Sequence, residues 1–189
     1  KQLIFYRQPG YQDECGRYWQ SFTDLRECSD VAMSIAVVDS GATTDPTRRY
    51  IDFAAEHDFA GVLVEGWNVG WDGDWFGNGQ DMDFTRPYPD FDLEGLAAYA
   101  RQQGVRLIGH HETGGNAAHY EEQMEAAFDL YARLGVAVVK TGYVADAGQA
   151  RVRGPDGEIL FAWHEGQDMV LHHQRVIEAA ARHHIAINA

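Results

Sequence analysis

The sequence has few basic residues for its length. It contains 15 lysines and arginines against 29 aspartates and glutamates in 189 residues, which gives a formal net charge of −14 at pH 7. A nucleic-acid partner is disfavoured, because binding to phosphates needs a basic face that displaces counterions. Binding to anionic membrane surfaces is disfavoured for the same reason. The acidic residues are scattered rather than gathered in a tail, so a neutral polar ligand suits this composition better.

Long apolar runs and cysteines are also scarce. No apolar run approaches the length of about 18 residues that a membrane-spanning helix needs, so no membrane insertion is expected. The only cysteines, Cys15 and Cys28, are compatible with a disulfide bond and equally with two buried thiols. Residues 1–5 contain neither an initiator methionine nor the apolar core of a signal peptide. We therefore expect an internal excerpt or a mature product without its leader.

From about residue 44 onward, amphipathic helices alternate with short apolar strands. Helices are expected over residues 44–57, 92–103, 116–134 and 167–183. Strands are expected over residues 61–67, 105–112, 136–144 and 184–189. The predicted capping residues are Thr44 or Asp45 for the first helix and Asp92 for the second. Alternation of this kind predicts an α/β fold in which crossover helices join parallel strands.

Long connections interrupt this alternation in two places. A loop of roughly two dozen residues, rich in Gly, Asp, Trp and Pro, follows the first strand, and loops of that length are usually functional. The second connection, residues 145–166, contains a predicted turn at residues 154–157 that tips a small hairpin. Residues 1–40 have no clean periodicity beyond a short apolar strand predicted at residues 32–38, and we assign them no role.

Polar side chains gather at the carboxyl ends of the predicted strands. They are Glu65, Trp67, His110, His111, Glu112 and Lys140. This asymmetry is typical of parallel α/β folds, whose functional loops lie at the carboxyl edge of the sheet. Because residues i and i+2 share one face of a strand, Glu112 points with His110, whereas His111 points away. The side chains expected to converge on one pocket are Glu65, His110, Glu112 and Lys140.

Each of these residues also has a structural interpretation. Glu112 could be a surface acid or part of a helix N-cap, and Glu65 could serve only as a buried ion-pair partner of Lys140. Three tryptophans form either a sugar-stacking platform or anchors of their loop: Trp67, Trp71 and Trp75. A solvated role is expected for the histidines of the last connection and helix, which are His164, His172, His173, His183 and His184.

Several motifs carry a family resemblance. They lie at residues 41–44, 49–55, 61–68, 88–92, 110–113, 139–143 and 166–167, and include His110-His111-Glu112-Thr113. Together they resemble the catalytic barrel of glycoside hydrolase family 97, a bacterial family of α-glucosidases and α-galactosidases. The resemblance covers about residues 41–189 and implies a partial (β/α)8 (TIM) barrel, left incomplete because a full barrel usually needs about 250 residues. It leaves residues 1–40 as an unassigned segment.

The resemblance also implies roles for individual residues. The glutamate of the His-His-Glu motif acts as a catalytic base in that family, which implies this role for Glu112. The residues expected to bind substrate, from their places at the strand ends, are Glu65, Trp67, His110, His111 and Lys140. Retaining members carry an aspartate nucleophile where this chain has Gly142, so the chain resembles the inverting, α-glucosidase-like branch. A glycine there leaves room for the water that inversion needs.

The expected function is therefore hydrolysis of a terminal α-glucosyl linkage with inversion, with an oligosaccharide as the partner. The general acid is expected beyond Ala189, so this chain alone is expected to be inactive. Calcium is expected in the full-length enzyme, with most of its ligands outside this chain and no metal ligand among the residues named above. Family analogy places the parent protein in the periplasm or outside the cell, and open barrel edges favour self-association.

Two alternatives stay open. One is a degenerate remnant that binds carbohydrate without turnover. The other is a metal-dependent barrel hydrolase with His110, Glu112 and Lys140 around zinc. The second alternative is weakened because His110 and His111 are adjacent, so their side chains diverge instead of reaching one metal ion.

Overall fold

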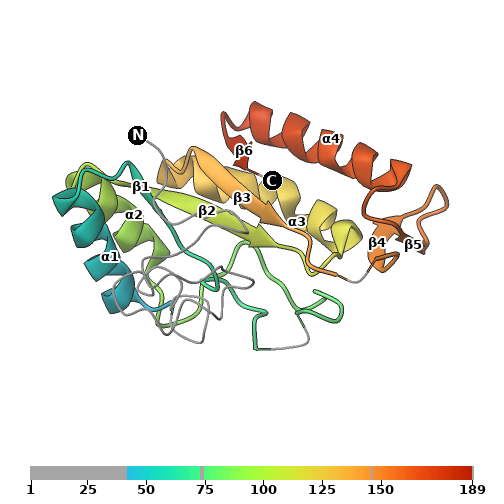
Figure 1. The fold of residues 1–189 in the computed structure, drawn as a ribbon, viewed down its shortest axis with the longest axis horizontal. Coiled ribbons are helices and arrows are strands. Elements are labelled where there is room, and N and C mark those ends of the chain that lie inside the picture. The colour runs from blue at the N-terminus through green and yellow to red at the C-terminus, as the bar shows by residue number, and fades with distance from the viewer. Residues whose placement is uncertain (1–41, 73–74, 146, 189) are drawn as a thin grey trace, which may run out of the picture. The chain divides into compact units, whose positions relative to one another are not determined.

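The computed structural model describes residues 42–72, 75–145 and 147–188, and Figure 1 shows the elements that they form. The helices are α1 (Thr44–Glu56), α2 (Leu93–Gln102), α3 (Ala117–Leu134) and α4 (Gln167–Arg182). The strands are β1 (Gly61–Leu63), β2 (Arg106–Glu112), β3 (Val138–Gly142), β4 (Ala150–Arg153), β5 (Ile159–Ala162) and β6 (Ala186–Asn188). The predicted helices and main strands are confirmed, although β1 is shorter than expected. The strand predicted at residues 32–38 and the two cysteines lie outside the described residues.

The main sheet has the strand order β1-β2-β3-β6. β2 pairs with β3 in parallel, and β3 pairs with β6 in parallel. α3 connects β2 to β3, and α4 lies between β3 and β6 in the chain. The predicted α/β class, with parallel strands joined by crossover helices, is therefore confirmed. This β/α repeat is the unit of (β/α)8 barrels, and the described residues supply four strands of such a sheet, fewer than a closed barrel needs.

The chain divides into two compact units. Among the described residues, the first unit contains 42–66 and 90–107, and the second contains 67–89 and 108–188. In the first unit α1 and α2 pack against each other, and their buried residues include Ile51, Ala54 and Leu96. The predicted polar groups other than Glu65 all belong to the second unit.

The helix caps of the first unit are only partly as predicted. Thr44 or Asp45 was expected to cap α1, but the N-cap is Thr43, whose side chain makes no capping hydrogen bond. The Thr44 hydroxyl instead donates to the carbonyl of Asp90 (2.9 Å) and accepts from the backbone N–H of Asp92 (2.8 Å). These bonds tie α1 to the start of α2, and that distant partner explains the error. The Asp92 cap of α2 is confirmed.

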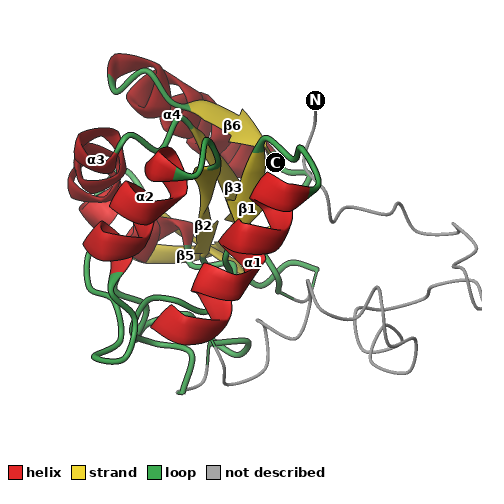
Figure 2. Ribbon diagram, turned by 90° about the vertical axis from the view of Figure 1, so that its left-hand side faces the viewer, coloured by secondary structure: helices red, strands yellow, loops and turns green. Residues whose placement is uncertain are grey.

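In the second unit, α3 covers one face of β2. A Cβ added to Gly109 would come within 2.4 Å of the Tyr131 ring, and the His111 ring stacks on the same tyrosine with a centroid distance of 5.0 Å. Side chains alternate along a strand, so Gly109 and His111 face the helix while His110 and Glu112 face the opposite side. Figure 2 shows α3 and α4 on the same side of β2, β3 and β6.

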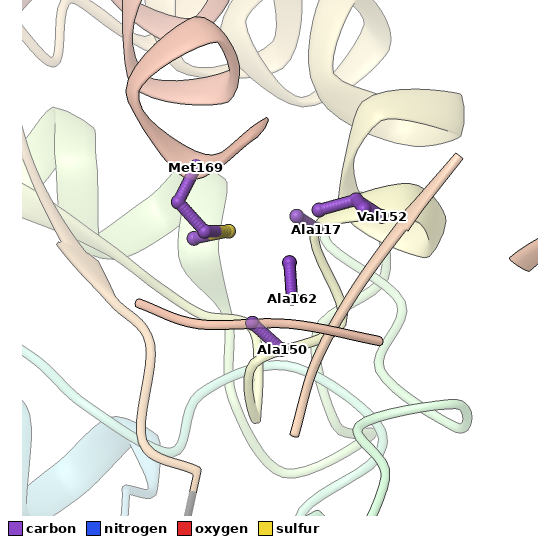
Figure 3. Packing of buried hydrophobic residues seen from close by; sticks show 5 residues of the cluster. All are labelled: Ala117, Ala150, Val152, Ala162 and Met169. Carbon is purple, nitrogen blue, oxygen red and sulfur yellow. The ribbon is translucent and has the colours of Figure 1, made fainter. Parts of the chain in front are cut away.

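The second connection forms the predicted hairpin. β4 and β5 are antiparallel, and the turn is closed by a hydrogen bond from the backbone N–H of Gly154 to the carbonyl of Glu158 (2.8 Å). One face of the hairpin is apolar and packs on the start of α3 and of α4. Figure 3 shows this cluster, which consists of Ala117, Ala150, Val152, Ala162 and Met169.

We predict that Gly109→Ala destabilises the chain by about 1–3 kcal/mol, because the added methyl group overlaps the Tyr131 ring in a packed interior. Chemical denaturation followed by circular dichroism measures the change. Gly104→Asn is the matched control, since no atom lies within 4 Å of a Cβ at Gly104 and asparagine tolerates its φ of +75°. Equal losses in the two variants would contradict the close packing of β2 on α3.

Candidate active site

The parallel register places several polar side chains on one face of the sheet. His110 is the partner of Lys140, which in turn is the partner of Asn188, and Glu112 is the partner of Gly142. Register partners in parallel strands point to the same side, so His110, Glu112 and Lys140 share the face opposite α3. Glu65 belongs to the first unit, and its convergence with these groups stays a prediction.

The carboxylate of Glu112 is held at the carboxyl edge of β2. Only 6% of the residue is exposed. Its Oε1 atom accepts hydrogen bonds from the backbone N–H groups of Gly114 and Val144, both at 2.9 Å. The N-cap of α3 is Asn116. Glu112 is therefore neither a surface acid nor the cap of the following helix, and two βα loops fix its orientation.

Gly142 is the reason why Glu112 can lie where it does. A Cβ added to Gly142 would come within 2.0 Å of Oε2 of Glu112 and 2.8 Å of its Cδ. The space beside Gly142 therefore holds the carboxylate itself, whereas the sequence had suggested room for a water molecule. A side chain at position 142 and the observed position of Glu112 exclude each other.

Trp71 extends this face from the long loop after β1. Its ring stacks on His110 with a centroid distance of 5.8 Å and an interplanar angle of 27°, and it contacts Trp75 at 5.0 Å. The indole N–H of Trp71 donates to Oδ1 of Asn68 (3.0 Å). A partly exposed indole beside His110 fits the sugar-stacking interpretation of Trp71.

Trp67 has a different environment from Trp71. It is 2% exposed, its ring packs on Tyr131 at 5.7 Å, and its indole N–H donates to the carbonyl of His110 at 3.3 Å. Of the two interpretations left open for Trp67, the anchoring role fits this burial. Any contribution of Trp67 to substrate binding is therefore indirect, through the position of His110.

His111 lies on the helix side of β2, as the strand alternation predicted. It is fully buried, and its Nδ1 atom lies 2.9 Å from the hydroxyl of Tyr120. Burial, with a smaller contribution from the neighbouring charge of His110, lowers the pKa of His111 to about 3. The imidazole is therefore uncharged at neutral pH and points away from Glu112, so a role in substrate binding would be indirect.

Comparison with known proteins decides the family. A model described as glycoside hydrolase 97 matches residues 19–189. The chain belongs to glycoside hydrolase family 97. The match begins closer to the N-terminus than the motifs at residues 41–189 indicated, in a part of the chain outside the described residues.

Solved structures agree with this assignment. The chain is similar to a family 97 enzyme from Pseudoalteromonas sp. strain K8 in complex with acarbose, with 53% identity, a TM-score of 0.75, and coverage of 78% of this chain and 22% of that one. A variant of that enzyme in complex with panose matches with the same values. A beta-arabinopyranosidase with 17% identity and a TM-score of 0.52, covering 80% of this chain and 20% of that one, is similar in fold alone. This family 97 chain thus spans 22% of the length of the Pseudoalteromonas enzyme.

The expectation that the histidines after residue 160 are solvated is wrong for His172 in this family 97 chain. His172 is 0% exposed, its Nδ1 lies 2.6 Å from a carboxylate oxygen of Glu121, and its Nε2 lies 3.0 Å from the hydroxyl of Tyr143. A signal for this burial was present, because His172 continues an apolar stripe of α4 that contains Met169 and Val176. The partner Glu121 on α3 could not be found from local pattern.

The network around His172 reaches the loop that holds Glu112. Burial acts to raise the pKa of Glu121, but hydrogen bonds from His172 and Arg175 outweigh it and lower that pKa. The imidazole of His172 therefore bridges the Glu121 carboxylate and the Tyr143 hydroxyl. Tyr143 directly precedes Val144, whose N–H binds Glu112. The network therefore fixes one of the two loops that orient the carboxylate.

The described residues contain no group of three or more His, Cys, Asp or Glu side chains arranged to hold a metal ion. The zinc alternative also needs converging ligands, and His111 diverges from His110 and Glu112 as shown above. Within the described part of the chain, no helix combines the length and the apolar character needed to cross a bilayer.

We predict that His111 makes the folded chain less stable in acid. Its folded pKa of about 3 lies below its ordinary value of 6.5, so between these values the unfolded chain binds more protons. The contribution is complete above pH 6.5 and is lost as the pH falls, by up to about 1.4 kcal/mol per pH unit. Denaturation measured from pH 7 to pH 4 should show a shallower pH dependence for His111→Asn than for the unmodified chain.

The control for this experiment is His184→Asn. His184 is exposed and has a φ of +57°, which asparagine tolerates. This substitution should leave the pH dependence of the unfolding free energy unchanged. If His111→Asn and the unmodified chain have parallel curves, the burial of a neutral His111 is wrong.

Proposed function

We propose that this chain carries the general base of an inverting, α-glucosidase-like hydrolase, and that the Glu112 carboxylate removes a proton from the water that attacks the anomeric carbon. The observation that carries the proposal is the buried carboxylate of Glu112, oriented by the N–H groups of Gly114 and Val144 at the carboxyl edge of the sheet. An oriented carboxylate is what a general base requires, because proton transfer depends on geometry before pKa.

The rest of the face supports binding of a sugar. Lys140 is the register partner of His110, and its ammonium group can donate hydrogen bonds to sugar hydroxyl groups. Trp71 supplies an aromatic surface beside His110, and rings of this kind pack on apolar faces of ligands. Glu65 is proposed as a further substrate-binding residue from the sequence pattern alone. Trp67 and His111 would act indirectly, by fixing β2.

Inversion requires a second carboxyl group that protonates the leaving oxygen while the base activates water on the opposite side of the sugar ring. We assign this general acid to a part of the enzyme beyond Ala189. The similarity to the Pseudoalteromonas enzyme supports an α-glucosidic oligosaccharide as substrate, since its structures are described as complexes with acarbose and with panose. Family membership supports the reaction class.

Three further expectations belong to the same proposal. Calcium would be bound chiefly by residues outside this chain, and the described residues form no cluster of three or more His, Cys, Asp or Glu side chains that fits it. The parent protein would be periplasmic or secreted. Among the described residues, β1 and β6 are the outer strands of the parallel sheet, and outer strands of this kind would favour self-association of the chain.

We predict that the isolated 189-residue chain does not hydrolyse p-nitrophenyl α-glucoside, because it supplies the base without the acid. Release of p-nitrophenol, followed by absorbance, is the measurement. The unreacted substrate incubated without protein gives the background rate. Turnover above this background that disappears in Glu112→Gln would show that the chain contains both catalytic groups.

The role of Glu112 is tested in a chimera. The Pseudoalteromonas enzyme is made with residues 42–188 of this chain in place of its own matching stretch, which the 53% identity of the two sequences permits. We predict that the chimera hydrolyses maltose and releases β-glucose first, as observed by proton NMR. Glu112→Gln in this chimera should lower kcat by about 10²–10⁴-fold, which is the usual contribution of a general base.

Glu94→Gln is the control for this substitution, because Glu94 is an exposed acid in the first turn of α2. It should leave the rate of the chimera unchanged. Loss of less than tenfold in Glu112→Gln would contradict the proposed base. The carbohydrate-binding remnant would be favoured by two results together. The isolated chain would bind maltose with the same affinity in both variants, and the chimera would show no turnover.

A further inference from the structure

The β4–β5 hairpin has a second face, which is polar and aromatic. Arg151 pairs with Phe161, and Arg153 pairs with Ile159. These four side chains share the face opposite the apolar cluster of Figure 3, because Ala150, Val152 and Ala162 occupy the alternate positions. Phe161 is 61% exposed, and Ile159 is 47% exposed. The exposure of this aromatic ring needs an explanation, because the next residue, Ala162, faces the buried apolar cluster.

A cavity lies against this face. Its volume is about 250 Å³, and Ile159 forms part of its apolar wall. The polar side chains that line it come from the long loop after β1, the N-terminal end of α3 and β4, and they are Gln80, Asn116, His119, Glu122, Arg151 and Arg153. Pockets for drug-sized ligands usually measure about 300–1,000 Å³. This cavity therefore fits a smaller ligand unit.

The lining combines hydrogen-bond donors and acceptors. Arg153 forms an ion pair with Glu122, which brings a carboxylate into the cavity wall. The side-chain amide of Asn116 donates to Oε1 of Gln80 (3.3 Å). The wall holds two arginines and one carboxylate, and Arg153 and Glu122 pair with each other, so the lining offers both donors and acceptors. A neutral polyhydroxyl ligand uses both kinds of group, since each hydroxyl both donates and accepts.

The ring of Phe161 is not part of the cavity lining, but it lies against Arg151, which is. The guanidinium group of Arg151 lies 5.6 Å from the centroid of the Phe161 ring and donates to the carbonyl of Gly77 (3.1 Å). The outer side of the ring faces solvent. Planar donors beside an exposed ring suit a sugar, whose hydroxyl groups lie at its edge and whose C–H groups form an apolar face.

We propose that this cavity, together with Phe161, is a second carbohydrate site that holds one hexose unit of an α-linked oligosaccharide. It is separate from the Glu112 face, because His119 and Glu122 belong to the helix that covers the opposite side of β2. The choice of α-linked glucose rests on the proposed function. The site is also joined to the catalytic loop, since the backbone N–H of Arg151 donates to the carbonyl of Gly115 at 2.7 Å.

The test is an NMR titration of the ¹⁵N-labelled 189-residue chain with maltotriose. We expect saturable shifts of the backbone amides of Arg151 and Phe161. Phe161→Leu, which keeps apolar surface but removes the ring, and Arg151→Gln should each weaken the binding measured at this site about fivefold or more, as loss of one contact does. Shifts that surround Glu112 should be unaffected by both substitutions.

Arg133→Gln is the matched control. Arg133 is an exposed arginine in the last turn of α3, paired with Asp129 and far along the helix from His119. It should not change the titration. The spectra of the variants report folding, and the 61% exposure of Phe161 makes its substitution tolerable. If a variant unfolds, Gln80→Ala replaces it, because Gln80 is an exposed lining residue.

The site is refuted if maltotriose leaves the amides of the hairpin unshifted, or if the shifts persist unchanged in the variants. Inorganic phosphate is titrated in parallel, and shifts caused by phosphate but not by maltotriose would show an anion site instead. If maltotriose binds at the hairpin but the chimera shows no turnover, the proposed function is overturned and the second site stands. If the chimera shows turnover but maltotriose does not bind at the hairpin, only the second site is overturned.

Discussion

The parallel register between β2 and β3 is the constraint on which the candidate site depends. It pairs Glu112 with Gly142 and His110 with Lys140. Because the carboxylate occupies the space where a side chain at position 142 would lie, a shift of one residue would place Glu112 beside Thr141 or Tyr143, and neither leaves that space open. The position of Glu112 is therefore a property of strand pairing as much as of the glutamate itself.

The two faces of β2 meet different requirements, and the sequence alternates accordingly. The face with His110 and Glu112 keeps polar groups at the carboxyl edge. The face with Gly109 and His111 meets α3, where a glycine admits the Tyr131 ring and an uncharged imidazole fills the aromatic interior. Adjacent histidines thus have separate chemistry, because a strand turns successive side chains to opposite sides.

Much of this arrangement follows from sequence periodicity. The alternation in residues 105–112 is enough to separate His111 from Glu112, since it depends only on strand geometry. The length of β1 could not be predicted, because the apolar run at residues 61–67 continues past the last paired residue. His172 was also missed: its apolar stripe on α4 was visible, but its partner Glu121 is 51 positions away in the sequence. Pairings of that kind arise only from packing.

The long connection between β3 and α4 fastens both loops that orient Glu112. Its first part, β4, reaches the loop after β2 through the hydrogen bond from Arg151 to Gly115, one residue after the N–H group that binds the carboxylate. Its last part supplies His164, whose Nε2 lies 2.8 Å from the carbonyl of Tyr143, one residue before the second N–H group. This connection therefore contributes to the rigidity of the carboxyl edge that holds Glu112. A ligand held on the outer face of the hairpin would be connected to Glu112 through the same backbone.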